Sequence, residues 1–422
     1  MFKTILIILF LNSIVMSQTN SYEKLYSLYN SKKFFRFINE LEKEKNNLSQ
    51  DERDAFLALH YTLINKPSES EILITALLGN NKAALHDSLK RDLYSISINN
   101  NVFIGNYKKS AEQTKIILEK YSKYIKEKDK EDYENSLIIW NAIQDVEKQS
   151  VIKNSETQID IKRDMAGLYN IPVTYNGENT DFIFDTGANF STITETYAKK
   201  MNLTFTSAKI KVGAITGKKI DAVIAYAKSF SIGNMEIKNT VFIVLPDEDL
   251  SFAGGMYKIN GIIGLPVIEA MQELIISKDG KLTVPKTPSV NTLNNFLMDG
   301  FIPVVEVDYK NNPMCFNFDT GARTTLLYAP FFKEYEKEIK EKYTVEDIKF
   351  GGAGGDTKIP GYKLKDIELS VGTDKVVIPE ISLLSVPVKD NEELMYGNLG
   401  QDFISKFDSM ILNFSSMSID FK

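Results

Sequence analysis

The strongest constraint on the fold of this chain is a tetrapeptide that occurs twice. Asp-Thr-Gly-Ala begins at Asp185 and again at Asp319, and each copy directly follows a short apolar run. One Asp-Thr-Gly alone carries little weight, because each of these residue types makes up roughly one in twenty residues of an average protein. Two copies indicate a duplicated segment if the features around them repeat as well.

The surrounding features do repeat, in the same order and at closely matching distances. A glycine-bearing segment between candidate strands begins at Ile210 in the first half and at Ile348 in the second. Next comes an apolar or nearly apolar pair followed by glycine, at Gly264 and Gly400. Each half then closes with alternating apolar and polar residues. This shared order indicates an internal duplication.

The repeated region has the texture of β-structure. From about residue 155 onward, glycine and β-branched residues are frequent and short alternating runs replace helical periodicity. "IPVTYNGENTDFIFDTGA" predicts a strand, an Asn-Gly turn and a second strand, and "IPVVEVDYKNNPMCFNFDTGA" predicts the same with a loop three residues longer. We expect a first lobe over residues 155–285, a polar linker with prolines over 286–299 and a second lobe over 300–422.

The segment before residue 150 is charged, nearly free of glycine and patterned for helices. One apolar stripe at helical spacing comprises Tyr22, Leu25, Tyr26 and Tyr29. Ser-x-x-Glu patterns at Ser49 and Ser68 predict two helix starts. The stretch 105–121 resembles the turn and second helix of a tetratricopeptide unit, and a plain bundle is the alternative. We expect residues 18–150 to form a helical domain whose aromatic stripes are core, with a peptide-binding groove as the rival interpretation.

The first seventeen residues have the pattern of a secretory signal peptide. Lys3 precedes an apolar stretch, and small or tolerated residues precede Gln18 at a cleavage position. An uncleaved membrane anchor is the alternative, but the stretch is shorter than the roughly twenty residues that span a bilayer. Cys315 is the only cysteine, so no internal disulfide can form. We expect export to a bacterial periplasm, the extracellular space or the cell surface, with no membrane span after cleavage.

Composition argues against several classes of function. The net charge is −6 and basic pairs lie among acidic neighbours, so we expect no nucleic-acid partner. His60 and His86, the only histidines, both fall in the helical segment. The β-rich part therefore has no histidine for catalysis, and we expect no metal and no cofactor. Without a histidine to activate it, Cys315 is expected to be a buried strand thiol.

Each half resembles one lobe of a retropepsin-like or pepsin-like aspartic protease. The resemblance rests on the order apolar-apolar-Asp-Thr-Gly-Ala, glycine-rich segment, apolar-apolar-Gly, and covers roughly residues 157–422. It implies a multidomain chain, with the helical domain followed by a bilobal β-barrel aspartic-protease fold of pseudo-twofold symmetry. It also implies a monomer, because both lobes lie in one chain. The tetrapeptide and the "GGAGG" flap are closer to the viral members, whereas the tandem arrangement is that of the pepsin-like ones.

In such a protein each lobe supplies one catalytic aspartate, here Asp185 and Asp319. Two carboxylates about 3 Å apart repel by roughly 5–6 kcal/mol at an effective dielectric of about 20, so they share one proton over several pH units. One then serves as general base toward water and the other as general acid, and the sequence does not assign the proton to either. The resemblance thus implies an aspartic endopeptidase acting on a peptide or protein.

The resemblance also assigns supporting residues. Those in the aspartate loops are Thr186, Gly187, Ala188, Thr320, Gly321 and Ala322. We expect the threonines to bond to the opposite loop, and the glycines to allow a tight turn and bring a backbone N–H to each carboxylate. The substrate-binding flaps contain Gly213, Gly217, Gly351, Gly352, Gly354 and Gly355. Gly264 and Gly400 are expected where another segment passes closely beneath each aspartate loop.

Several alternatives stay open. Ala188 and Ala322 lack the hydroxyl that acid-adapted relatives carry after the triplet, which predicts activity at mildly acidic to near-neutral pH. Arg323 is either a solvated loop charge or a group that acts on the carboxylates or the substrate. A cleft of this kind can also serve a weak or inactive peptide-binding protein, with the helical domain recruiting a protein partner or acting as a scaffold.

Overall fold

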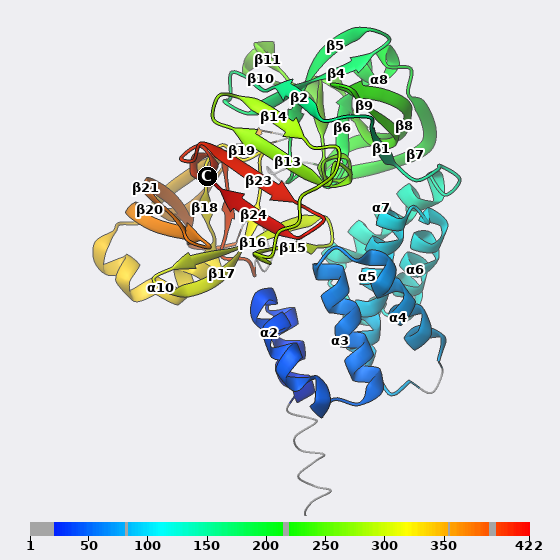
Figure 1. The fold of residues 1–422 in the computed structure, drawn as a ribbon, viewed down its shortest axis with the longest axis vertical. Coiled ribbons are helices and arrows are strands. Elements are labelled where there is room, and N and C mark those ends of the chain that lie inside the picture. The colour runs from blue at the N-terminus through cyan, green and yellow to red at the C-terminus, as the bar shows by residue number, and fades with distance from the viewer. Residues whose placement is uncertain (1–20, 81–82, 214–218, 353–354, 388–393) are drawn as a thin grey trace, which may run out of the picture.

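The computed structural model describes residues 21–80, 83–213, 219–352, 355–387 and 394–422. Helices occupy the first part of the chain and strands dominate the rest, so the predicted order of a helical part before a β-rich part is confirmed (Figure 1). In these ranges no helix is both long and apolar enough to cross a membrane. The predicted signal peptide lies outside the described residues.

The helical part is a series of helices joined by short turns. A helix over residues 21–30 is followed by α2 (Phe34–Glu44), η1 (Lys45–Asn47), α3 (Gln50–Leu63), α4 (Pro67–Gly79), α5 (Asp87–Ile104), α6 (Tyr107–Lys120), η2 (Ser122–Tyr124) and α7 (Glu127–Ala142). From α3 to α7, each helix packs against the next one in the sequence. Tyr22 and Leu25 of the predicted stripe are buried in the helical core. The likeness to tetratricopeptide units remains a prediction.

Only one of the two predicted capping boxes forms. Ser49 caps α3, with its side chain and that of Glu52 exchanging hydrogen bonds with each other's backbone. A helix does begin next to Ser68, but the predicted capping box is wrong, because α4 starts one residue earlier at Pro67 and has no side-chain cap. Proline fits the first helical position, where its missing N–H costs no hydrogen bond, so the helix starts there.

The first lobe is built on a mixed sheet in the order β1-β9-β6-β12-β5-β4-β8-β7, with β3 beside β4. Its strands are β1 (Ser150–Lys153), β3 (Lys162–Arg163), β4 (Tyr169–Tyr175), β5 (Glu178–Phe184), β6 (Ser191–Thr194), β7 (Thr204–Gly213), β8 (Lys219–Ile232), β9 (Met235–Leu245) and β12 (Gly261–Ile263). The lobe also contains α8 (Glu195–Lys200), the small pair β10 (Ser251–Phe252) and β11 (Tyr257–Lys258), and α9 (Leu265–Ala270).

The second lobe is built on a sheet in the order β15-β16-β17-β22-β18-β21-β20-β19. Its elements are β15 (Phe296–Asp299), β16 (Ile302–Tyr309), β17 (Asn312–Phe318), β18 (Leu326–Leu327), α10 (Ala329–Lys342), β19 (Glu346–Gly352), β20 (Gly355–Val371), β21 (Asp374–Leu384), β22 (Gly397–Leu399) and α11 (Gln401–Ile404).

The two sheets share one connectivity around the strands that lead to the aspartates. In the first lobe β5 is parallel to β12, and β6 is antiparallel to β12 and parallel to β9. In the second lobe β17 is parallel to β22, and β18 is antiparallel to β22 and parallel to β21. The repeat found in the sequence therefore reappears as a repeated strand topology. Each lobe contains a mixed sheet, which we do not describe as a barrel.

A third sheet joins the lobes. Its order is β2 (Thr157–Asp160), β14 (Lys281–Val284), β13 (Glu273–Ser277), β23 (Ser409–Asn413) and β24 (Ser418–Phe421). The closing strands of the two halves meet in its middle, where β13 pairs antiparallel with β23 over five residues of each. Figure 1 shows this sheet between the two lobes. One continuous apolar core extends through both lobes and this sheet.

The hairpins that lead to the aspartates correct one detail of the prediction. The Asn176-Gly177 turn joins β4 to β5 as expected, with φ values of 49° and 80°. In the second half, Lys310 and Asn311 form a two-residue turn of the same kind, with φ values of 56° and 62°. The longer loop predicted there is wrong, because both turns contain two residues and the strands that lead to the aspartates, β5 and β17, have seven residues each. The extra residues lie in β16, between its Ile-Pro-Val sequence and the turn.

Two segments differ from the predicted boundaries. β15 lies within the residues expected to be linker, because Phe296, Leu297 and Met298 are apolar and buried against β16. β1 begins at Ser150 and pairs with β9, so the first sheet includes residues assigned to the helical part or to the gap after it.

The helical part packs against both lobes. Leu297 and Cys315 of the second lobe lie in the same apolar core as α2 and α3. On the first lobe, α7 lies beside β7 (Figure 1). There Asn135 accepts a hydrogen bond from the backbone N–H of Lys211 at 3.4 Å and donates one to its carbonyl at 3.1 Å. Glu131 forms an ion pair with Lys219 at 2.6 Å.

Candidate active site

Asp185 and Asp319 follow directly after equivalent central strands, β5 and β17. The N–H of Asp185 donates to the carbonyl of Ile263 at 3.1 Å, and that of Asp319 donates to the carbonyl of Leu399 at 3.1 Å. The phenylalanines that precede the aspartates in both strands are fully buried. The apolar run before each aspartate therefore anchors the strand, and the first polar residue marks the point at which the chain leaves the core.

Reciprocal threonine bonds bring the two loops together. The N–H of Thr186 donates to Oγ1 of Thr320 at 3.0 Å, and the N–H of Thr320 donates to Oγ1 of Thr186 at 2.9 Å. Each hydroxyl also donates to a carbonyl of the opposite strand, that of Phe318 at 3.2 Å and that of Phe184 at 3.0 Å. Both threonines are fully buried. Four hydrogen bonds thus fix one loop against the other, away from competing water.

The loop glycines lie against the opposite carboxylates. Each donates its N–H to the aspartate of its own loop, Gly187 to Asp185 at 2.8 Å and Gly321 to Asp319 at 2.7 Å. The expected tight turns are present, closed by N–H bonds from Ala188 to the carbonyl of Asp185 at 3.4 Å and from Ala322 to that of Asp319 at 3.3 Å. Neither glycine has a positive φ, so the turn itself does not require glycine. A Cβ on Gly187 would lie 2.6 Å from Cγ of Asp319, and one on Gly321 would lie 2.3 Å from Cγ of Asp185. Glycine is required because the two carboxylates cross over these positions.

Gly264 and Gly400 lie under the aspartate loops. A Cβ on Gly264 would approach the carbonyl oxygen of Phe190 to 2.6 Å, and one on Gly400 would approach that of Ala322 to 2.9 Å. The residues after these glycines donate backbone N–H bonds to the carbonyls of Ala188 and Ala322, at 2.8 and 2.9 Å. The loops therefore rest directly on backbone that no larger residue would allow to approach.

The electrostatics of the pair favour a shared proton. Burial raises the pKa of Asp185 well above its ordinary value, and the nearby charge of Asp319 raises this pKa further. Backbone N–H groups of Gly187 and Ala188 act in the opposite direction but more weakly. Asp185 therefore keeps its proton at pH values at which an exposed aspartic acid would be ionised.

The sequence analysis missed Asn398, which contacts one aspartate directly. Its side-chain amide donates to Oδ2 of Asp319 at 3.2 Å. The equivalent position in the first half is Ile262, as the matching strand registers show. A residue-by-residue alignment of "NGIIG" with "YGNLG" reveals this polar replacement, so the signal was present in the sequence.

The second loop also has a polar support that pattern reasoning did not find. Gln401 donates to the carbonyl of Thr320 at 2.6 Å and accepts a hydrogen bond from Arg163 of the first lobe at 2.7 Å. The carboxylate of Asp402 accepts bonds from the backbone and hydroxyl of Thr325, at 2.8 and 2.6 Å. These contacts link the second aspartate loop to α11 and, through Arg163, to the opposite lobe.

The predicted flaps are the ends of two long hairpins. Gly213 pairs with Lys219 at the end of β7, and Gly217 lies outside the described residues. Gly352 pairs with Gly355 at the end of the β19–β20 hairpin, which also contains Gly351, whereas Gly354 lies outside the described residues.

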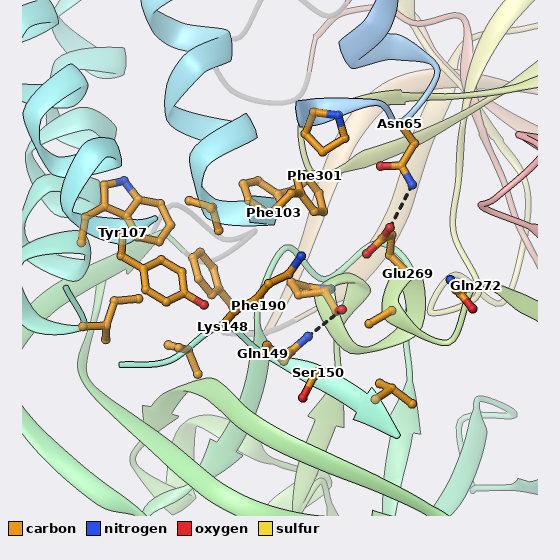
Figure 2. Close-up of a pocket in the computed structure, with 18 residues that line it drawn as sticks. Asn65, Phe103, Tyr107, Lys148, Gln149, Ser150, Phe190, Glu269, Gln272 and Phe301 are labelled. Atoms are coloured by element: carbon orange, nitrogen blue, oxygen red, sulfur yellow. Dashed lines mark hydrogen bonds between the residues drawn. The ribbon is translucent and has the colours of Figure 1, made fainter. Parts of the chain in front are cut away.

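An aromatic stack and a cavity lie beside the first aspartate loop. The ring of Phe190, five residues after Asp185, packs against Trp140 of α7 at 5.8 Å and against Phe301 of the second lobe at 6.1 Å. Phe301 in turn stacks on Phe103 of α5 at 4.8 Å, as Figure 2 shows. The neighbouring cavity measures about 330 Å³. The helical part and both lobes therefore meet at the loop that carries Asp185.

The cavity wall also contains a half-buried acid. Asn65 donates to Glu269 at 2.9 Å, and Gln149 donates to the carbonyl of Pro266 at 2.7 Å (Figure 2). Burial raises the pKa of Glu269 above its ordinary value, and the hydrogen bond from Asn65 opposes this shift. These contacts join the turn after α3 and the approach to β1 to helix α9 of the first lobe.

Two residues singled out in the sequence have simple environments. Arg323 is exposed, and its side chain passes beside Gly167 of the first lobe. Cys315 is a buried thiol in β17, as predicted, and burial raises its pKa to about 12. A thiol with such a pKa stays protonated near neutral pH and is a poor nucleophile.

Comparison with known proteins supports an aspartyl protease-like domain in this chain. A family model described as "Aspartyl protease" matches residues 171–267, a segment that contains Asp185 and Gly264. No curated protein matches the chain. Solved structures that are similar to it include basic 7S globulin from soybean, at 10% sequence identity and a TM-score of 0.38 over 64% of this chain and 94% of the globulin. Conglutin gamma, a basic 7S globulin from lupine seeds, has 10% identity and a TM-score of 0.37 over 63% and 94% of the two chains.

Proposed function

We propose that this protein is an aspartic endopeptidase in which Asp185 and Asp319 activate a water molecule together. The observation that carries the proposal is the crossed geometry of the two loops. Each carboxylate passes over the glycine of the opposite loop, and two buried threonines hold the loops in this position. Such a fixed pair of acids is what hydrolysis of an amide requires when histidine and metal take no part.

In the proposed reaction the pair carries one proton. The ionised carboxylate takes a proton from water as the water oxygen attacks the carbonyl carbon of the peptide. At the same time the protonated carboxyl group donates its proton to the carbonyl oxygen of the peptide. The tetrahedral intermediate then collapses: one of its hydroxyl groups returns a proton to the ionised carboxylate as the C=O bond re-forms, the C–N bond breaks, and the amide nitrogen takes the proton of the other carboxyl group. The pair again carries one proton. The N–H groups of Gly187 and Gly321 orient the carboxylates throughout.

Four further parts of the proposal extend the expectations drawn from the sequence. The two lobes form one pseudo-symmetric, bilobal protease fold within a monomer, since both aspartates come from one chain. The chain is exported, and its helical part contacts a protein partner or supports the protease. The two long hairpins act as flaps over an extended peptide. Because Ala188 and Ala322 offer no hydroxyl to the ionised pair, activity is greatest at mildly acidic to near-neutral pH.

The decisive experiment compares cleavage of a peptide library by wild type, Asp185→Asn and Asp319→Asn. Either substitution removes a titratable group and keeps the shape of the side chain, so we expect cleavage to fall by about 10²- to 10⁴-fold. Asp181→Asn is the matched control, because this carboxylate lies in β5, the strand that leads to Asp185, and its partner among the described residues is Lys162, in an exposed ion pair. Wild-type rates in either active-loop variant would disprove the proposal.

The same experiment separates the alternative function. A protein that only binds peptides would show no cleavage by wild type, while its peptide affinity would survive both substitutions. In that outcome the crossed loops would serve to shape a binding cleft.

A further inference from the structure

We propose that Asn398 is a positioning residue that makes the two aspartates unequal, by stabilising Asp319 in its ionised form so that the shared proton resides on Asp185. This inference rests on the proposed peptidase function. It assigns the general base to Asp319 and the general acid to Asp185, a distinction that two similar loops do not make by themselves.

The first observation is a break in the internal symmetry beside the carboxylates. In the second lobe, β17 and β22 pair in parallel with Asn317 opposite Asn398. In the first lobe, β5 and β12 pair in the same way with Ile183 opposite Ile262. Two amides therefore replace two aliphatic side chains at equivalent places. The polar pair occurs only next to Asp319.

The second observation is the direction of the hydrogen bond. The amide of Asn398 donates to Oδ2 of Asp319 at 3.2 Å, and Asn398 itself is only 9% exposed. A donor placed against a carboxylate favours the charged form, and such charge-assisted bonds are stronger than neutral ones. Ile262, the counterpart of Asn398, has no donor to offer Asp185.

The backbone donors are alike in the two loops, so the side-chain amide is what distinguishes them. Oδ1 of Asp319 accepts bonds from the N–H groups of Gly321 at 2.7 Å and Ala322 at 3.1 Å. Asp319 thus receives donors at both carboxylate oxygens. Asp185 likewise has backbone donors, the N–H of Gly187 at 2.8 Å and that of Ala188, and burial raises its pKa in spite of both.

Other charged groups near the loops do not explain the asymmetry. Arg323 is exposed and passes beside Gly167, and Arg163 is bound to Gln401. Asp402 is held by the backbone and hydroxyl of Thr325. Within the described part of the chain, the charge that acts on Asp185 is that of Asp319 itself.

The test is the dependence of kcat/KM on pH, measured with a fluorogenic peptide selected from the library. Asn398→Ile copies the first lobe and removes the amide, so ionisation of the pair requires a higher pH. We expect the acid limb of the profile to move up by about one pH unit, and kcat/KM well below the limb to fall about tenfold. A side chain with only a structural role would lower the plateau and leave the limb in place.

Three further variants sharpen the test. The double exchange Asn398→Ile/Ile262→Asn transfers the amide to the other aspartate, and we expect it to move the limb back toward its wild-type position. Asn317→Leu removes the neighbouring amide, whose Oδ1 has no hydrogen-bond partner among the described residues, and is expected to leave the limb unmoved. If Asn398→Ile fails to fold, Asn398→Ala removes the same donor at lower volume.

The outcomes distinguish this inference from the function beneath it. An unmoved acid limb in the folded Asn398 variants would overturn the role of Asn398, even if Asp185→Asn and Asp319→Asn abolish cleavage. Full activity in the aspartate variants would overturn the peptidase proposal itself, whatever the Asn398 variants do.

Discussion

Replacing Thr320 by valine tests whether the crossed threonine bonds hold the lobes together. Valine keeps the shape of the side chain but removes the hydroxyl, which accepts a bond from the N–H of Thr186 and donates one to the carbonyl of Phe184. Both partners then stay buried without a hydrogen bond. Each such group costs about 1–3 kcal/mol, so the free energy of unfolding should fall by roughly 2–6 kcal/mol. That is a large share of the roughly 5–15 kcal/mol that stabilises a typical domain.

The measurement is a urea titration, followed by tryptophan fluorescence and by far-ultraviolet circular dichroism. Thr240→Val is the matched control, because Thr240 is fully buried and, among the described residues, its hydroxyl has no hydrogen-bond partner. Removing an unsatisfied hydroxyl should be neutral or slightly stabilising. If Thr320→Val and Thr240→Val unfold at the same urea concentration, the crossed bonds do not stabilise the pair of loops and the reasoning fails.

Three further predictions concern the same loops. Gly187→Ala places a Cβ 2.6 Å from Cγ of Asp319, so kcat/KM should fall by about a hundredfold or more in a protein that still folds; near wild-type kinetics would contradict the required close approach. Because the folded state binds the proton of Asp185 more tightly than the unfolded state, this residue lowers stability as pH rises above the ordinary aspartate range. Asp185→Asn should therefore melt above wild type at neutral pH and lose this advantage below about pH 4, and a constant difference across pH would refute the linkage. Phe190→Ala removes contacts with Trp140 and Phe301 and should cost about 2 kcal/mol in a urea titration, whereas an unchanged midpoint would show that the stack is not stabilising.

Local patterns predicted the strands that carry the aspartates. Asn176-Gly177 supplies two residues that tolerate positive φ, so the turn and the strands on either side of it could be read directly. Lys310 and Asn311 form the same turn without a glycine, and the prediction there placed the extra residues in the loop. A turn of this kind is specified partly by the strand pairing around it, which local sequence does not reveal.

Contacts between segments far apart in the sequence were harder to predict than the local elements. The threonine bonds were expected only because of the resemblance, since no local pattern indicates that Thr186 and Thr320 meet. The pairing of β13 with β23 joins residues more than a hundred positions apart, and the sequence of neither strand indicates which strand it pairs with. Asn398 could have been found from the sequence, but only by asking where the two halves differ as well as where they agree.

The contact between Asn135 and β7 has a consequence for the behaviour of the β-rich part in solution. β7 is the last strand of its sheet, and the amide of Asn135 occupies both backbone groups of Lys211 at that edge. An uncovered edge strand offers free N–H and C=O groups on which another chain can add a strand. The helical part therefore shields the sheet from edge-to-edge association, and a fragment that starts at β1 would expose a template for aggregation.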